Sequence, residues 1–281
     1  MEARVRVAVL GVGSLGRQHT RIYGEMHRRG TVELVGVYDT DSALAKSIAE
    51  KHGTAALGSV EAAAAAAEAL SIVTPTITHH ALAKPLLEQG KHLLIEKPMT
   101  DDAAQAADLV RLAKRHDCVL QVGHIERFNP VFNYLREAVC EPRFIESHRL
   151  SPYPARSMDI GVVLDLMIHD LDIVLAFVRS PVEHVDAAGV RVLSVSEDIA
   201  NARLRFPSGC IADLTASRVS DKAERKMRIF QSGLYLSLDY GTGQARKLQV
   251  DSGAAPVPET LRPESFQLGK GDALLSEIES F

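Results

Sequence analysis

Residues 162–177, VVLDLMIHDLDIVLAF, place three acids and a histidine in an otherwise apolar stretch. Asp165 and His169 are four residues apart and share one face of a helix. Asp172 follows three residues later on nearly the same face, whereas Asp170 points elsewhere. A carboxylate near an imidazole orients the ring and raises its basicity, as a general base requires. Since burying unpaired charge is costly, the segment predicts an active-site wall, and a structural hydrogen-bond network is the alternative.

A second set of candidate residues surrounds a glycine-rich turn. Residues 5–10 (VRVAVL) predict a buried strand, which runs into Gly11-Val12-Gly13-Ser14-Leu15-Gly16, a helix and a second strand over residues 31–38. This arrangement binds dinucleotides, because the glycines allow close approach to the pyrophosphate and the helix N-terminus offers free N–H groups. Asp39, 23 residues after Gly16, is placed to bind the adenosine ribose hydroxyls. A carboxylate repels a 2′-phosphate, so NAD is favoured over NADP.

The elements that must position these residues alternate between strands and helices up to residue 123. Residues 55–57, for example, predict a short strand, and the alanine-rich residues 61–70 predict a helix. Such alternation predicts a parallel, doubly wound sheet with ligands beyond the carboxyl ends of the strands. The candidate cofactor-binding residues at those ends, and at the start of the helix after the third strand, are Thr74, Pro75, His79, Glu96 and Lys97, and His124 is a candidate substrate contact.

Lys97 is the strongest candidate among these strand-end residues. It directly follows an apolar strand and precedes Pro98, which restricts its backbone. Oxidation of a secondary alcohol needs a base such as His169 for the hydroxyl proton, and a nearby ammonium group stabilises the developing alkoxide. The ordinary alternative for Lys97 is an exposed loop lysine.

Composition limits the class of protein. The chain has 281 residues, which is comfortable for two domains, and 46% of them are hydrophobic. The net charge of −4, without a long basic block, argues against a nucleic-acid partner. Three cysteines without CxxC spacing indicate a reducing compartment. Without a signal peptide or a span of about 18 apolar residues, we expect a cytoplasmic protein with no membrane partner.

The pattern changes after Pro130, where stretches of alternating apolar and polar residues replace the alternation of strands and helices. This favours a large, mostly antiparallel open sheet in an α+β domain. We therefore predict an NAD-binding Rossmann domain over residues 1–123 and a substrate-binding and oligomerisation domain over residues 124–281. Two potential ligands without a further His/Cys set do not favour a metal site.

The ordered motifs resemble the Gfo/Idh/MocA family of NAD(P)-dependent sugar oxidoreductases. The resemblance rests on the glycine-rich turn, Glu96-Lys97-Pro98 and Asp165-x-x-x-His169, and it covers nearly the whole chain. It implies that Lys97 and His169 form the catalytic pair, with Asp165 supporting the histidine. It also implies a homodimer or homotetramer formed through the second domain's sheet.

The segments VGHIERFNP and SPYPARSMDIGVVLDLMIHDLD are similar to those of family members that oxidise the 3-hydroxyl of UDP-N-acetylglucosamine for lipid A biosynthesis. This likeness implies contacts from Arg127, Asn129, Arg149 and Arg156 to sugar or diphosphate, because arginine binds phosphate through paired hydrogen bonds. Ordinary surface arginines are the alternative. Family members normally continue beyond the segment resembling LLSEIESF, so we expect the second domain to be truncated at its C-terminus.

Three rival hypotheses remain open. A free-sugar or inositol dehydrogenase of the same family differs only in its pocket residues. A non-catalytic sugar- or NAD-sensing regulator is disfavoured because both Lys97 and His169 are present. Reduction of an unsaturated or tetrapyrrole-like substrate on the same fold does not require the pair formed by Asp165 and His169.

Overall fold

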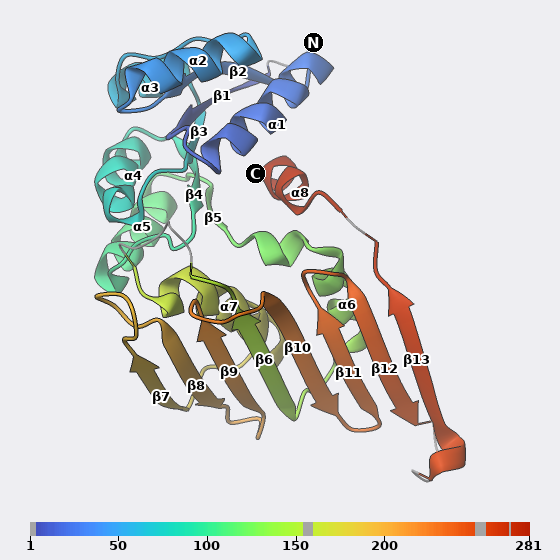
Figure 1. Cartoon of the computed structure of the whole chain (residues 1–281). Coiled ribbons are helices and arrows are strands. Elements are labelled where there is room, and N and C mark those ends of the chain that lie inside the picture. Colours follow the sequence, from blue (N-terminus) through green and yellow to red (C-terminus); the bar gives the residue numbers. More distant parts are fainter. Residues whose placement is uncertain (1–3, 154–159, 251–256, 270) are drawn as a thin grey trace. The chain divides into compact units, whose positions relative to one another are not determined.

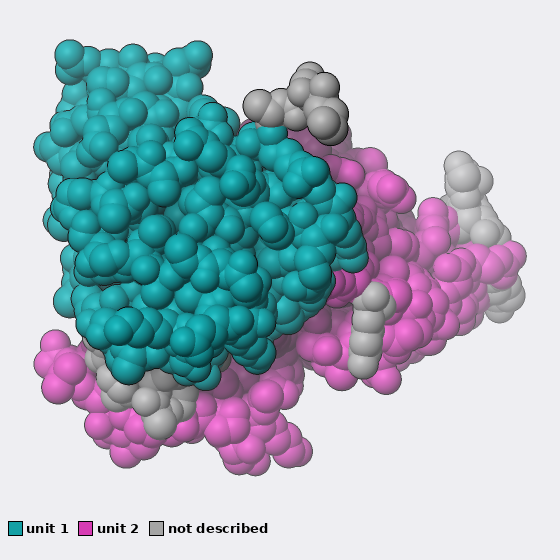
Figure 2. Space-filling view, turned by 90° about the horizontal axis from the view of Figure 1, so that it is seen from above, with its two compact units in different colours: residues 1–123, 274–281 teal, residues 124–273 magenta. Residues whose placement is uncertain are grey.

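The chain divides into two compact units. The structure is a computed structural model that describes residues 4–153, 160–250, 257–269 and 271–281. The first unit comprises residues 1–123 together with 274–281, and the second comprises residues 124–273 (Figure 2). The division after Gly123 coincides with the predicted domain boundary. Residues 274–281 were predicted in the second domain but group with the first unit.

The first unit contains a five-stranded parallel sheet with strand order β2-β1-β3-β4-β5 (Figure 1). Its strands are β1 (Val5–Leu10), β2 (Val32–Tyr38), β3 (Ala69–Ile72), β4 (His92–Glu96) and β5 (Leu120–Gly123). This order belongs to doubly wound α/β sheets, in which the strand order reverses beside the first strand. The predicted fold class is confirmed for this unit.

Helices cover both faces of this sheet (Figure 1). They are α1 (Gly16–Arg29), α2 (Ser42–His52), α3 (Val60–Ala66), α4 (His79–Glu88), α5 (Ala103–Arg115) and the C-terminal α8 (Ala273–Ser280), with the short 3₁₀ helix η1 (Thr76–Thr78) before α4. One core joins α3, α4 and α5 to the sheet through residues such as Ala63, Leu87 and Leu109. Local signals fix the helix ends: the Asp41 carboxylate accepts hydrogen bonds from two amides of α2, which stops at Gly53 in the left-handed region.

Two sequence predictions in this unit differ from the structure. The helix predicted over residues 61–70 ends at Ala66, and residues 69–72 form β3. All four residues of β3 are buried between β1 and β4, so sheet pairing overrides the helix propensity of the alanine-rich segment. The strand predicted at residues 55–57 is reduced to a single bridge between Val37 and Ala56.

The second unit contains an eight-stranded sheet with order β13-β12-β11-β10-β6-β9-β8-β7. All neighbours pair antiparallel except β6 and β9, which confirms the predicted, mostly antiparallel sheet. The strands are β6 (Phe144–Leu150), β7 (His184–Val190), β8 (Ile199–Arg205), β9 (Ile211–Ser217), β10 (Glu224–Gln231), β11 (Leu234–Asp239), β12 (Gln244–Val250) and β13 (Leu261–Gln267). The sequences of the last two strands are polar and show little alternation between apolar and polar residues.

Helical segments cover one face of this sheet. They are η2 (Ile125–Phe128), α6 (Pro130–Ala138), the π-helical turn η3 (Val163–Met167) and α7 (Ile168–Val178), while η4 (Pro258–Thr260) precedes β13. Alternate strand residues, such as Ala202 and Leu214, pack with Phe132 and Phe177 in one core. Among the described residues, no helix is long and apolar enough to cross a membrane.

The C-terminal helix α8 buries an acid inside the first unit. Its residues Leu274, Glu277 and Ile278 are buried, and the backbone carbonyl of Glu277 accepts a hydrogen bond from the Gln121 side chain at 2.9 Å. The Glu277 side chain is fully buried, and among the described residues neither carboxylate oxygen has a hydrogen-bond partner. Burial, with a smaller contribution from the charge of Glu96, raises the pKa of Glu277 from 4.5 to about 8.

Glu277→Gln is therefore expected to stabilise the protein, and more strongly as the pH rises. Between pH 4.5 and about 8 the folded protein holds a proton on Glu277 that the unfolded chain has lost, so stability falls as the pH rises through this window. The isosteric amide removes this loss, so the advantage of the variant grows by up to about 1.4 kcal/mol per pH unit. Urea unfolding at pH 5, 6.5 and 8 measures the difference in the free energy of unfolding between Glu277→Gln and wild type. Glu279→Gln, at an exposed position of the same helix, is the control. An advantage that is independent of pH contradicts the prediction.

Candidate active site

The glycine-rich turn between β1 and α1 has the close packing that a dinucleotide site needs. Gly11 has a φ of +84°, and a Cβ there would lie 2.5 Å from the Val73 carbonyl oxygen. A Cβ on Gly16 would lie 1.9 Å from the Gly11 carbonyl oxygen. Gly13, by contrast, is exposed, with no atom within 4 Å of a Cβ built there. Two glycines are thus required by the turn itself, whereas Gly13 leaves its backbone open to a ligand together with exposed Ser14 and Leu15.

Asp39 lies at the end of β2 and contacts this turn. Its Oδ2 accepts a hydrogen bond from the Val12 amide at 2.8 Å, and its Oδ1 accepts one from the Asp41 amide at 2.9 Å. Oδ1 also accepts a longer hydrogen bond from the Thr40 hydroxyl at 3.5 Å, whereas Oδ2 retains a second lone pair that can accept from a ribose hydroxyl. The residues present therefore fit a dinucleotide with an unphosphorylated 2′-hydroxyl.

The turns after β3 and β4 are tied together by His79. One ring nitrogen lies 2.8 Å from the Thr74 carbonyl oxygen, and the other lies 3.0 Å from the Pro98 carbonyl oxygen. His79 is only 1% exposed, whereas Pro75 is exposed. This changes the interpretation of His79: its ring holds two turns in place instead of presenting itself to a cofactor.

Glu96 and Lys97 lie at the end of β4. The Glu96 carboxylate contacts the buried ring of His19 through Nε2 at 3.1 Å and accepts a hydrogen bond from the Lys97 backbone amide at 3.2 Å. A Cβ on Gly123 would lie 2.8 Å from Glu96 Oε2, so the next strand makes room for this carboxylate. Glu96 thus fixes the backbone of Lys97, which is partly buried. Sequence reasoning missed His19, whose only signal is its position on the buried face of α1.

In the second unit, Asp170 and Asp172 of the apolar helix form ion pairs. The Asp170 carboxylate accepts two hydrogen bonds from Arg149 on β6, both at 3.0 Å, and Arg149 also donates to Glu126 on η2 at 3.0 Å. All three side chains are buried. Burial opposes the charge of Arg149, but the two carboxylates raise the pKa of its guanidinium further. Arg149 is therefore part of the core, and we do not retain it as a substrate contact.

Asp172 forms an ion pair with Arg127, which lies within η2. The Arg127 guanidinium donates to both carboxylate oxygens at 2.6 and 2.7 Å, and a His124 ring nitrogen lies 3.9 Å from Asp172 Oδ2. The Arg127 side chain remains 47% exposed. Asn129 caps α6 by accepting a hydrogen bond from the Val131 amide at 3.0 Å. The Asn129 side chain thus has a structural role as a helix cap, in addition to the predicted contact with substrate.

Asp165 and His169 lie on the π-helical turn η3 and the first turn of α7. Both side chains are partly exposed, and four residues span close to one turn in either helix type, so they face the same side. The predicted contact Arg156 lies outside the described residues. The arrangement in this unit provides an imidazole and a carboxylate on one face, with Asp170 and Asp172 engaged elsewhere.

Comparison with protein-family models identifies both parts of the chain. Residues 5–124 match the model described as "Oxidoreductase family, NAD-binding Rossmann fold". Residues 136–233 match the model described as "GFO/IDH/MocA C-terminal domain".

Individual relatives agree with the family models. The UDP-N-acetylglucosamine 3-dehydrogenase of Acidithiobacillus ferrooxidans is 40% identical over 99% of this chain and 87% of its own length. A solved structure of that organism's enzyme superposes with a TM-score of 0.90 and 38% identity, covering 99% of this chain and 87% of the other. An inositol 2-dehydrogenase of Rhizobium meliloti is 27% identical over 95% of this chain and 79% of its own length.

Gly13→Ala tests the open position of the dinucleotide turn. The added methyl group meets no protein atom, so stability should change by less than about 0.5 kcal/mol. It occupies the space through which the pyrophosphate approaches the backbone, and NAD binding should weaken by about tenfold or more. Calorimetric titration with NAD measures this loss, and Gly58→Ala, at another exposed and open glycine, is the control. Equal NAD affinity in both variants contradicts the assignment.

Four observations indicate the same family. They are the geometry of the glycine-rich turn, the order of the parallel sheet, the matches to two family models, and a relative that is 40% identical over 99% of the chain. Each is a separate kind of observation, since the turn is local, the sheet order is topological and the identity extends over both units. The chain therefore belongs to the GFO/IDH/MocA family and is an NAD(P)-dependent oxidoreductase that acts on CH–OH groups.

Proposed function

We propose that this protein is a dehydrogenase that uses NAD to oxidise the 3-hydroxyl of UDP-N-acetylglucosamine or of a closely similar nucleotide sugar. The observation that carries the proposal is the 40% identity, over 99% of this chain, to a protein named UDP-N-acetylglucosamine 3-dehydrogenase. The inositol dehydrogenases are the alternative, and their similarity is weaker, for example 27% identity.

In the proposed mechanism, three side chains act on the reacting hydroxyl. His169 accepts the hydroxyl proton, and Asp165, on the same helix face, orients the imidazole and stabilises its protonated form. The Lys97 ammonium group stabilises the negative charge that develops on the oxygen. Bound NAD supplies the acceptor for the hydride that leaves the same carbon.

The cofactor is proposed to lie against the glycine-rich turn and the adjoining strand ends. Gly13, Ser14 and the N-terminus of α1 would hold the pyrophosphate, and Asp39 would accept hydrogen bonds from the ribose hydroxyls. Glu96 and His79 contribute indirectly, because they fix the turns that carry Lys97 and Thr74.

For the sugar nucleotide, His124, Arg127, Asn129 and Arg156 remain the proposed contacts. Arg127 is partly exposed while its pair with Asp172 fixes its guanidinium, so it can offer an oriented donor to a diphosphate. We further propose a cytoplasmic location, on the grounds of cysteine usage and sequence composition. The family resemblance implies that the protein is a homo-oligomer and acts in lipid A biosynthesis.

A substrate panel tests the proposed function. Purified protein is mixed with NAD and, in turn, UDP-N-acetylglucosamine, UDP-glucose, glucose and myo-inositol, and NADH formation is followed by absorbance. Since bound NADH can mask turnover, the protein is first freed of nucleotide by unfolding and refolding or by extensive dialysis. Turnover of UDP-N-acetylglucosamine with the highest kcat/KM is expected. A higher kcat/KM for myo-inositol keeps the family and replaces the substrate.

Lys97→Ala tests the proposed catalytic pair. Without the ammonium group the developing charge on oxygen is not stabilised, so kcat should fall by about 10²–10⁴-fold while NAD affinity stays within about threefold. The exposed Lys114→Ala in α5 serves as the control for loss of a positive charge. Steady-state kinetics and NAD titration measure both quantities, and near-normal turnover of Lys97→Ala refutes the role of the lysine.

A further inference from the structure

The helix that carries Asp165 and His169 begins without a capping side chain of its own. Val162 occupies the N-cap position, and it has no polar side chain to accept hydrogen bonds from the first amides. Those amides are satisfied by Glu197, on the connection between β7 and β8. The Val162 amide donates to the Glu197 backbone carbonyl at 3.0 Å, and the Val163 amide donates to Glu197 Oε1 at 3.3 Å.

Gly161 makes this remote cap possible. A Cβ built on Gly161 would lie 1.9 Å from Glu197 Oε1, so any side chain at this position would displace the carboxylate. The Gly161 carbonyl oxygen in turn accepts a hydrogen bond from the Asp165 amide at 3.0 Å. Glu197 therefore accepts hydrogen bonds from the two amides that directly follow Gly161, the residue to which the Asp165 amide is bonded.

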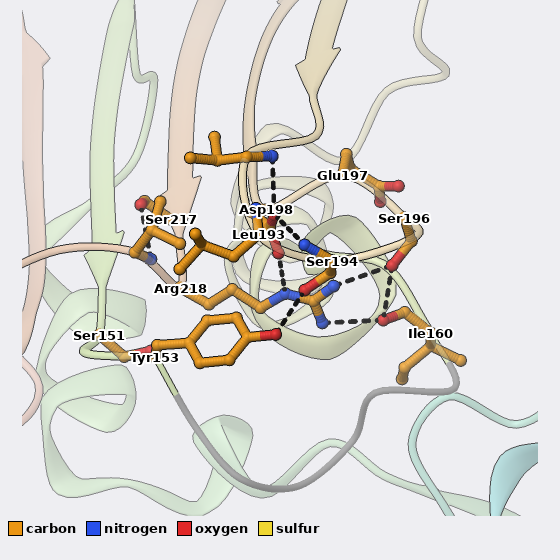
Figure 3. Close-up of polar contacts among 12 residues, drawn as sticks. Ser151, Tyr153, Ile160, Leu193, Ser194, Ser196, Glu197, Asp198, Ser217 and Arg218 are labelled. Carbon is orange, nitrogen blue, oxygen red and sulfur yellow. Dashed lines mark hydrogen bonds and ion pairs between the residues drawn. The ribbon is translucent and has the colours of Figure 1, made fainter.

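Glu197 is itself held by its neighbour Asp198, which is completely buried (Figure 3). Asp198 Oδ2 accepts hydrogen bonds from the amides of Val192, Leu193 and Ser194, at 2.8, 2.6 and 2.8 Å. Its Oδ1 accepts one from Arg218 Nε at 2.9 Å. Although burial opposes ionisation, hydrogen bonds from the Ser194 side chain and from the amides of residues 192–194 hold the pKa of Asp198 well below its usual range.

Arg218 connects this pair to the chain just before the helix. It is fully buried after the end of β9, and its Nη1 donates to the Ile160 carbonyl oxygen at 2.9 Å. Its Nη2 donates to Ser196 Oγ at 2.8 Å (Figure 3). Arg218, paired with the buried Asp198, thus holds both Ile160, just before the helix, and Ser196, the residue before Glu197.

We propose that Glu197, held by Asp198 and Arg218, is a positioning residue that sets the orientation of Asp165 and His169. This inference rests on the proposed function. It assigns to Glu197 an effect on the catalytic imidazole of His169, transmitted through the first turn of the helix that carries Asp165 and His169. Glu197 does not touch the reacting atoms. Its contribution is the hydrogen-bond acceptor that fixes the Val163 amide, not its charge.

Glu197→Ala and Glu197→Gln separate these contributions, because glutamine retains the acceptor oxygen. In Glu197→Ala, kcat should fall about tenfold or more, since small misplacements of catalytic groups are costly, while KM for NAD stays within about twofold. Glu197→Gln should restore kcat to within about twofold of wild type. Glu183→Ala, at an exposed acid before β7, is the control, and thermal unfolding shows that each variant is folded.

A readout independent of the substrate accompanies the kinetics. The titration of the His169 ring is followed by NMR of protein labelled with ¹⁵N-histidine and assigned with His169→Asn, and its midpoint should shift in Glu197→Ala but not in Glu197→Gln. A kcat of Glu197→Ala within twofold of wild type, or an equal loss in both variants, overturns the proposal. If no sugar of the panel is oxidised, the proposed function fails by itself, and an unchanged His169 titration in Glu197→Ala then overturns the positioning role.

Discussion

The second unit depends on one constraint, namely that charge buried in an apolar core must be paired. Arg149, Asp170 and Glu126 satisfy it by joining β6, α7 and η2 in a single buried ion network. Removing one partner of such a network typically costs about 3–5 kcal/mol, because the remaining charge stays buried. The network therefore fixes the rotation of α7 about its axis. That rotation in turn decides which side of the helix presents Asp165 and His169.

The parts of the fold that could be predicted are those fixed by short-range patterns. The turn from Gly11 to Gly16 has a steric reason for its glycines, and the parallel order of the first sheet follows from strands alternating with helices. The prediction failed where long-range strand pairing competes with local helix propensity. The helix of the alanine-rich segment ends at Ala66, because the residues that follow form β3 in the middle of the sheet.

The candidate site shows the same division. The spacing of Asp165 and His169, and the position of Lys97 after a buried strand, are visible in the sequence because both are local. The partners of Arg149 and the contacts of His79 depend on which distant backbone or side chain arrives opposite them, and no local pattern carries that information. Glu197 is a further case, because its role depends on the absence of a side chain at Gly161, some 36 residues earlier.

The first unit is discontinuous along the chain, since residues 274–281 join residues 1–123 after the whole second unit has intervened. During synthesis on the ribosome, the nucleotide-binding unit must therefore wait for α8 while the second unit emerges. Until then, the sites that receive Leu274 and Ile278 are uncovered apolar surface, and the Gln121 side chain lacks its carbonyl acceptor. The surface that α8 covers is thus synthesised before the residues that cover it, with the whole of residues 124–273 in between.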